Sequence, residues 1–258
     1  MSNENHGFST LVRFGLSRSF KTPYGLFYLA MGIFLPVMIM SLLIFVGSTS
    51  TSHHIAKIQG ATIGINNPVV YQIFSTIPTI LPIFTIIGSV GSTYLFSSDR
   101  SNGVYEYLIA TRRVRIKDIF ISNIVTVVIG VSIILGLDLL IIFSVVSRTD
   151  SGILVDMFKL IALESIPLSY LGALLSMLAI LIWASLSKTY VGINSPGGIG
   201  IFVGFAPVLL LTILVNTGTV AAKDLYLFGG LYSLALFAIF VAFLILVSQK
   251  ISNESMLT

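Results

Sequence analysis

The sequence contains no cysteine, and charged residues make up only 9% of its 258 residues. The absence of cysteine excludes disulfide bonds, thiolate metal sites and thiol redox chemistry. Soluble domains carry about 25% charged residues, so this chain has too few charges to cover a surface that faces water. Hydrophobic residues make up 55% of the chain instead. The composition predicts a membrane protein, and its net charge of +4 comes from bases beside apolar runs, which does not indicate nucleic-acid binding.

Six apolar runs are long enough to cross a bilayer, which takes about 20 residues in a helix. They cover residues 25–47, 69–96, 119–147, 160–187, 197–215 and 225–248. An even number of spans places both termini on the same side of the membrane. We therefore expect an all-α membrane protein with one six-helix transmembrane domain over 25–248, an N-terminal segment at 1–24 and a tail at 249–258.

The distribution of Lys and Arg predicts which side that is. Three bases precede the first span, five follow the second, one follows the fourth and one follows the last, which leaves four on the opposite side. Cytoplasmic loops carry the excess of Lys and Arg in membrane proteins. The sequence thus predicts a multi-pass protein of the cell membrane with both termini in the cytoplasm.

The N-terminal segment has the pattern of an amphipathic helix. Apolar residues recur at helical spacing, with polar and basic residues on the opposing face: Phe8, Leu11, Val12, Leu16 and Phe20 against Arg13, Ser17 and Lys21. Such a helix lies flat at the membrane surface, with its apolar side in lipid and its bases toward the headgroups. A disordered tail is the alternative interpretation.

The loop at 98–118 is the one long charged stretch between apolar runs. It holds five of the fourteen bases: Arg100, Arg112, Arg113, Arg115 and Lys117. Basic residues beside a span are by default a topology signal and a contact for lipid headgroups.

Within this loop, Tyr105, Leu108 and Ile109 fall at i, i+3 and i+4, which predicts a short helix with an apolar stripe. Gly103 allows a break before it, and Glu106 flanks the stripe. Because a stripe of this size cannot form a core alone, it lies on the membrane or docks against a partner, and both interpretations stay open.

The pattern Asp99-Arg100-x-x-Gly103-x-x-Glu106-x-Leu108-x-Ala110-Thr111-x-x-x-Arg115 resembles the cytoplasmic motif of ABC exporter permeases of the type 2 class. In that family the motif follows the second of six spans, and an interfacial helix precedes the first. This architecture matches nearly the whole chain. The sequence departs from the motif at Arg112, where proline is usual, and at Tyr107, where leucine is frequent.

The resemblance implies a permease subunit that pairs with a second one, as a homodimer or a heterodimer, and that binds a separate ABC ATPase subunit. The residues that it assigns to ATPase coupling are Gly103, Tyr105, Glu106, Leu108, Ile109, Arg113 and Arg115. Glu106 would be the polar anchor, paired with Arg113 or with a base of the ATPase, and the three apolar residues would supply the contact. Because the chain has no Gly-x-x-x-x-Gly-Lys-[Ser/Thr] phosphate loop, it is not itself an enzyme, and ATP and Mg would belong to the partner.

Two acidic residues fall inside predicted spans. Asp138 is in the middle of the third, where an ionisable side chain costs a few kcal/mol and usually faces the bundle interior. It predicts either a hydrogen-bonded structural group or the site of an ion-coupled secondary transporter or channel, which is the alternative function. Glu164 follows Lys159 by five residues, and an interfacial pair between them accounts for both.

Two other features bear on assembly and chemistry. Gly200 and Gly204 form a small-xxx-small pair in the fifth span, which allows close helix approach, and the resemblance places dimer contacts on the first and fifth spans. All three histidines, His6, His53 and His54, lie outside the spans, so we expect no metal site and no intramembrane catalytic dyad.

Overall fold

The computed structural model describes residues 4–47, 68–110, 115–149, 152, 154–186, 196–216 and 225–250. Within these ranges the side chains of some helical residues are also left undescribed. His53, His54, Arg113 and most of the predicted tail lie outside the described residues, so the predictions made for them are not tested.

Every element among the described residues is a helix. The elements are α1 (Glu4–Lys21), α2 (Pro23–Gly47), α4 (Pro68–Ser101), α5 (Val104–Ala110), α6 (Ile116–Thr149), α7 (Leu154–Leu160), the π-helical turn η2 (Ile161–Ser165), α8 (Ile166–Leu186), α9 (Pro196–Asn216) and α10 (Leu225–Lys250). The all-α prediction is therefore confirmed. Each of the six predicted spans coincides with a helix, although α4 and α6 are longer than their apolar runs and the fourth helix begins earlier, at Leu154.

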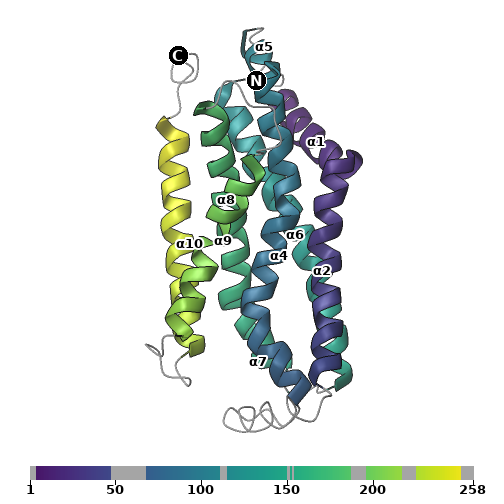
Figure 1. Cartoon of the computed structure of the whole chain (residues 1–258). Helices are drawn as coiled ribbons and strands as arrows, with labels where there is room; N and C mark the ends of the chain where they lie inside the picture. Colours follow the sequence, from purple (N-terminus) through teal and green to yellow (C-terminus); the bar gives the residue numbers. More distant parts are fainter. Residues whose placement is uncertain are drawn as a thin grey trace.

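The long helices run side by side, and α5 lies beyond one end of the bundle (Figure 1). The beginning of α1 and the end of α10 lie at that same end. Helix α4 is central, because it packs against α2, α6, α8 and α9. Its residues Leu81, Ile86 and Val90 are wholly buried, together with Leu168 and Met177 of α8. Helix α4 also contacts α1, α5 and η2, so it lies at the centre of the packing.

Glycines allow two helix pairs to approach closely. A Cβ atom on Gly32 of α2 would lie 2.9 Å from the Cα atom of Gly88 in α4. A Cβ atom on Gly204 of α9 would lie 2.7 Å from the carbonyl oxygen of Gly172 in α8. A Cβ atom on Gly200 would meet Ile180 of α8, also within 3 Å.

The sequence left open which helix this small-residue face meets. The face of Gly200 and Gly204 packs against α8 of the same chain, so these glycines form an intrachain seam. The exposed side of α9 carries large apolar residues instead, with Phe202 72% exposed. The sequence pattern showed that a helix packs there but not which helix it is.

Several helices have the length and composition of membrane spans. Among the residues whose side chains are described, three segments qualify: Lys117–Arg148, Leu154–Ile182 and Leu227–Ile245. A fourth qualifies if α1 and α2 are counted together, although the chain bends by 73° between them. Thr79–Gly91 in α4 and Ile199–Leu214 in α9 are shorter apolar segments of the described part. These helices are those of a membrane-embedded protein.

Candidate functional site at the α4–α5 end

The turn between α4 and α5 depends on Gly103. Its φ of 69° lies in the left-handed region that favours glycine, and it directly follows the end of α4. The N–H of Asn102 donates to the carbonyl oxygen of Ser98 at 3.0 Å, which closes the last turn of α4. The N–H of Tyr107 donates to the carbonyl oxygen of Gly103 at 3.1 Å, which starts α5. The predicted break at Gly103 and the short helix after it are both present.

Helix α5 exposes apolar side chains at the end of the bundle. Tyr107 is 64% exposed and Val104 is 36% exposed, and the two are three residues apart on one face. Leu108 and Ile109, which the sequence assigned to the contact surface, are only partly exposed. The side chains of Tyr105 and Glu106 are not among those described, so their roles stay predictions. The sequence analysis did not single out Tyr107 and Val104. Their spacing is helical, but so is that of the stripe through 105, 108 and 109, and spacing alone does not show which face is exposed.

Arg115 begins α6. Its backbone N–H donates to the Oδ2 atom of Asp118 at 3.3 Å, and its carbonyl oxygen accepts from the N–H of Asp118 at 3.0 Å. A carboxylate in the first turn that caps a free backbone N–H stabilises the start of a helix. Arg115 itself is exposed.

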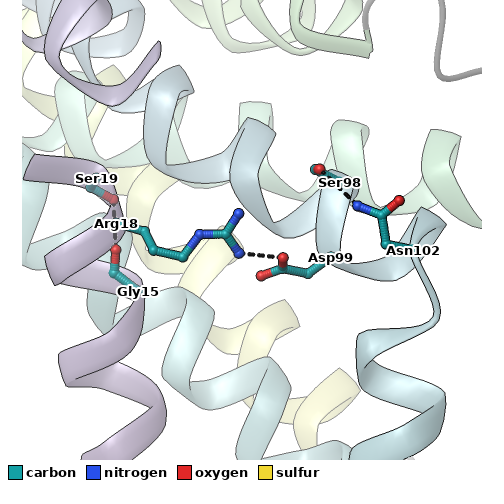
Figure 2. A network of polar contacts seen from close by, with 6 residues as sticks. All are labelled: Gly15, Arg18, Ser19, Ser98, Asp99 and Asn102. Atoms are coloured by element: carbon teal, nitrogen blue, oxygen red, sulfur yellow. Dashed lines mark hydrogen bonds and ion pairs between the residues drawn. The ribbon is translucent and has the colours of Figure 1, made fainter. Parts of the chain in front are cut away.

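Asp99, the first residue of the motif, is bonded to the N-terminal helix. The guanidinium of Arg18 in α1 donates to the Oδ1 atom of Asp99 near the end of α4 (Figure 2). Asp99 is 7% exposed, whereas 28% of the Arg18 side chain is exposed. The Arg18 guanidinium also lies 5.3 Å from the ring centre of Phe14, a cation–π distance. The ion pair therefore joins α1 to the segment that leads into α5.

A tight elbow places Arg18 there. The hydroxyl of Thr22 accepts from the N–H of Gly25 at 3.2 Å, which caps the start of α2, and Pro23 occupies the first helical position. Gly25 leaves no room for a Cβ atom, because the carbonyl oxygen of Ser19 lies against it. This elbow produces the 73° bend and lays α1 across the bundle, against α6, α2 and α4.

The two acids of the predicted spans lie at one depth of the bundle. The hydroxyls of Ser132 in α6 and Tyr170 in α8 are 2.7 Å apart, and the rings of Phe143 and Phe158 are 6.4 Å apart. On α6, Asp138 lies about midway in sequence between Ser132 and Phe143. On the antiparallel neighbour, Glu164 lies midway between Phe158 and Tyr170. Asp138 is 1% exposed, and neither carboxylate oxygen has a hydrogen-bond partner among the described residues.

Glu164 does not pair with Lys159, which corrects the sequence-based expectation. Lys159 bonds Asp156 at 3.2 Å on the exposed side of α7. Glu164 belongs to the π-helical turn η2, is 5% exposed and packs against α10. A Cβ atom on Gly229 of α10 would lie 2.5 Å from its Oε2 atom. Glu164 is thus buried with its carboxylate against Gly229, whereas the side chain of Lys159 is 65% exposed, so the two side chains do not meet.

The predicted site residues thus fall into three groups. The described residues of the motif, Asp99 to Ala110 and Arg115, lie at one end with Arg18. The two buried acids lie on α6 and in η2, and Gly200 and Gly204 form the seam with α8. No group of three metal-ligating side chains occurs among the described residues. No family model, curated protein or solved structure matches the chain.

Proposed function

We propose that the chain is the transmembrane permease subunit of an ATP-driven ABC exporter, with α5 docking on a separate ATPase subunit. The observation that carries this proposal is α5 itself, a seven-residue helix beyond the bundle with Tyr107 and Val104 exposed. An exposed apolar pair on such a short element favours a protein partner. The residues around it carry the motif that resembles the coupling element of type 2 permeases.

In this proposal all six long helices cross the membrane. The shortest, α8 and α9, have 21 residues, which span about 30 Å in an α-helix, the thickness of a hydrocarbon core. The bent-away α1 lies at the cytoplasmic interface. The distribution of bases places both termini in the cytoplasm, and the location of α1 and the end of α10 at one end of the bundle supports this topology.

The coupling route is short. ATP and Mg²⁺ bind to the ATPase partner, and the closing of an ATPase pair moves two α5 helices together. Because α5 continues from α4 through Gly103, and α4 is the central helix, the movement changes the packing of the bundle. ATP drives the switch between inward-facing and outward-facing states only by favouring one of them. The second permease subunit contacts the exposed apolar faces of α2 and α9, such as the sides of Phe34 and Phe202.

Co-purification of an ATPase tests this proposal. Tyr107→Asp places a charge on the exposed face of α5, and we expect it to abolish co-purification of an ATP-binding subunit while membrane insertion stays normal. Asn102→Asp is the matched control, because it adds the same charge at an exposed position before α5 and should retain the partner. Equal recovery of the partner with both variants would argue against docking on α5.

An ion-coupled transporter or channel is the second candidate function. Asp138 favours it, since a wholly buried carboxyl without hydrogen-bond partners among the described residues has no evident structural role. In this alternative Asp138 carries the coupled proton or cation, and the chain works without an ATPase. Transport that continues without ATP and stops with Asp138→Asn would favour this function over the first.

A further inference from the structure

Helix α1 carries two stripes of residues spaced four apart. The apolar stripe is Phe8, Val12, Leu16 and Phe20, and the polar stripe, each member one position later, is Ser9, Arg13, Ser17 and Lys21. Residues four apart lie on the same face of a helix, so the stripes run parallel along α1. Both line one open groove of about 600 Å³, which Val125 of α6 borders on the other side.

The groove stays open because of how α1 packs. The residues of α1 that are buried against the bundle are small, Gly15 and Ser19, and Arg18 bonds Asp99. The larger apolar side chains are left at the edge of this contact, and all four members of the apolar stripe are only partly buried. A long apolar groove along an interfacial helix is where an acyl chain gains contact with protein.

The charge along the groove has one sign. Arg13 and Lys21 are exposed and line the groove, and they lie eight residues apart, or about 12 Å along the helix. The hydroxyls of Ser9 and Ser17 line the same groove and add hydrogen-bond donors. No acidic residue lines it among the residues whose side chains the structure describes. The two basic side chains and the nearby serines suit the phosphate of a lipid headgroup. The apolar stripe of the same groove suits the acyl chain of that lipid.

We propose that this groove binds an anionic phospholipid, with an acyl chain along the apolar stripe and the phosphate group between Arg13 and Lys21. Its volume lies in the range of about 300–1,000 Å³ that ligand sites occupy. The bound lipid holds α1 against α6 and thereby keeps Arg18 at Asp99, beside the turn into α5. The inference rests on the interfacial location of α1 in the proposed function, but not on the ATPase partnership.

The test is native mass spectrometry of the purified full chain in detergent, titrated with phosphatidylglycerol or phosphatidylcholine. We expect phosphatidylglycerol to bind roughly tenfold or more tightly, because each base near a membrane surface favours anionic lipid. Arg13→Gln with Lys21→Gln should reduce its binding to the level of phosphatidylcholine. The matched control, Arg148→Gln with Lys159→Gln, removes the same charge from two exposed positions outside the groove and should keep the preference.

A second variant examines the apolar stripe. Val12→Trp fills the groove without changing charge, so it should weaken the binding of both lipids. Equal binding of the two lipids to the unmodified chain, or an equal loss with the control pair, would overturn the proposal. So would a dimer of the chain that dissociates on Val12→Trp while lipid binding is unchanged, because the groove would then hold a second copy. If phosphatidylglycerol is not preferred but the ATPase still co-purifies, only the proposed lipid site is wrong. If phosphatidylglycerol is preferred but no ATPase co-purifies, the lipid site stands and the exporter function is rejected.

Discussion

The guanidinium of Arg18 bonds the carboxylate of Asp99, a residue 81 positions further along the chain. The pair connects the N-terminal helix to the end of the central helix, directly before Gly103 and α5. In the exporter account, a movement of α5 that displaces the end of α4 must carry α1 with it or break this bond. In that account the pair is a mechanical link as well as a structural one.

Substitution of Arg18 and substitution of Asp99 should reduce the stability of the protein by different amounts. Arg18→Gln leaves the nearly buried carboxylate of Asp99 unpaired, so we expect a loss of about 2–3 kcal/mol in the free energy of unfolding. Asp99→Asn leaves Arg18, which reaches solvent, and should cost less. Thermal unfolding of the single variants and of the double variant in detergent measures the coupling. Strictly additive losses would show that the two side chains do not interact.

An added methyl group in the seam between α8 and α9 should destabilise the protein. Gly204→Ala places a Cβ atom 2.7 Å from the carbonyl oxygen of Gly172, and backbone cannot move aside easily, so we expect a loss of about 1–3 kcal/mol. Gly136→Ala is the control, because a Cβ atom there would have no neighbour within 4 Å. Its effect should be neutral or stabilising, by up to about 1 kcal/mol. Equal thermal stability of the two variants would contradict the intrachain seam.

The position of the Glu164 carboxylate against Gly229 predicts that one substitution can offset the destabilising effect of another. Gly229→Ala introduces a Cβ atom against the Glu164 carboxylate and should destabilise the protein, because the carboxylate must leave its place between η2 and α10. Glu164→Ala in the same chain frees that space, so the double variant should be more stable than the sum of the single effects implies. A melting experiment on the three variants decides this. Absence of any rescue would mean that Glu164 does not occupy the notch at Gly229.

Asp138 distinguishes the two candidate functions. Asp138→Leu removes a buried polar group without hydrogen-bond partners among the described residues, so we expect an increase of about 1–3 kcal/mol in stability. The exporter account expects transport to continue, whereas the ion-coupled account expects it to stop. Asp156→Asn, at an exposed carboxylate paired with Lys159, is the control and should change little. Lower stability of Asp138→Leu would show that the carboxyl has a structural partner.

The helices could be predicted from the sequence, but several of their contacts could not. A long apolar run must satisfy its backbone hydrogen bonds internally, so length and composition define a helix. The apolar runs end at residues 96 and 147, whereas helices α4 and α6 continue to Ser101 and Thr149. Hydropathy detects the part in lipid and not the turns that extend beyond it.

The site was only partly predictable for a related reason. Helices α2 and α10 are apolar on all sides, so periodicity does not reveal which face packs inward. Which helix covers Gly204, and where Glu164 points, both depend on tertiary packing. The bond between Arg18 and Asp99 depends on the elbow at Thr22 and Pro23, and a sequence separation of 81 residues gives no local signal.

The central claim is that α5 contacts an ATPase, and a photoreactive amino acid at position 107 tests it most directly. Illumination of intact membranes, followed by identification of the crosslinked polypeptide, reports what touches the exposed face of α5. We predict a separate ATP-binding chain, with crosslinking that changes when ATP is added. Crosslinks only to lipid or to the chain's own helices would contradict the account.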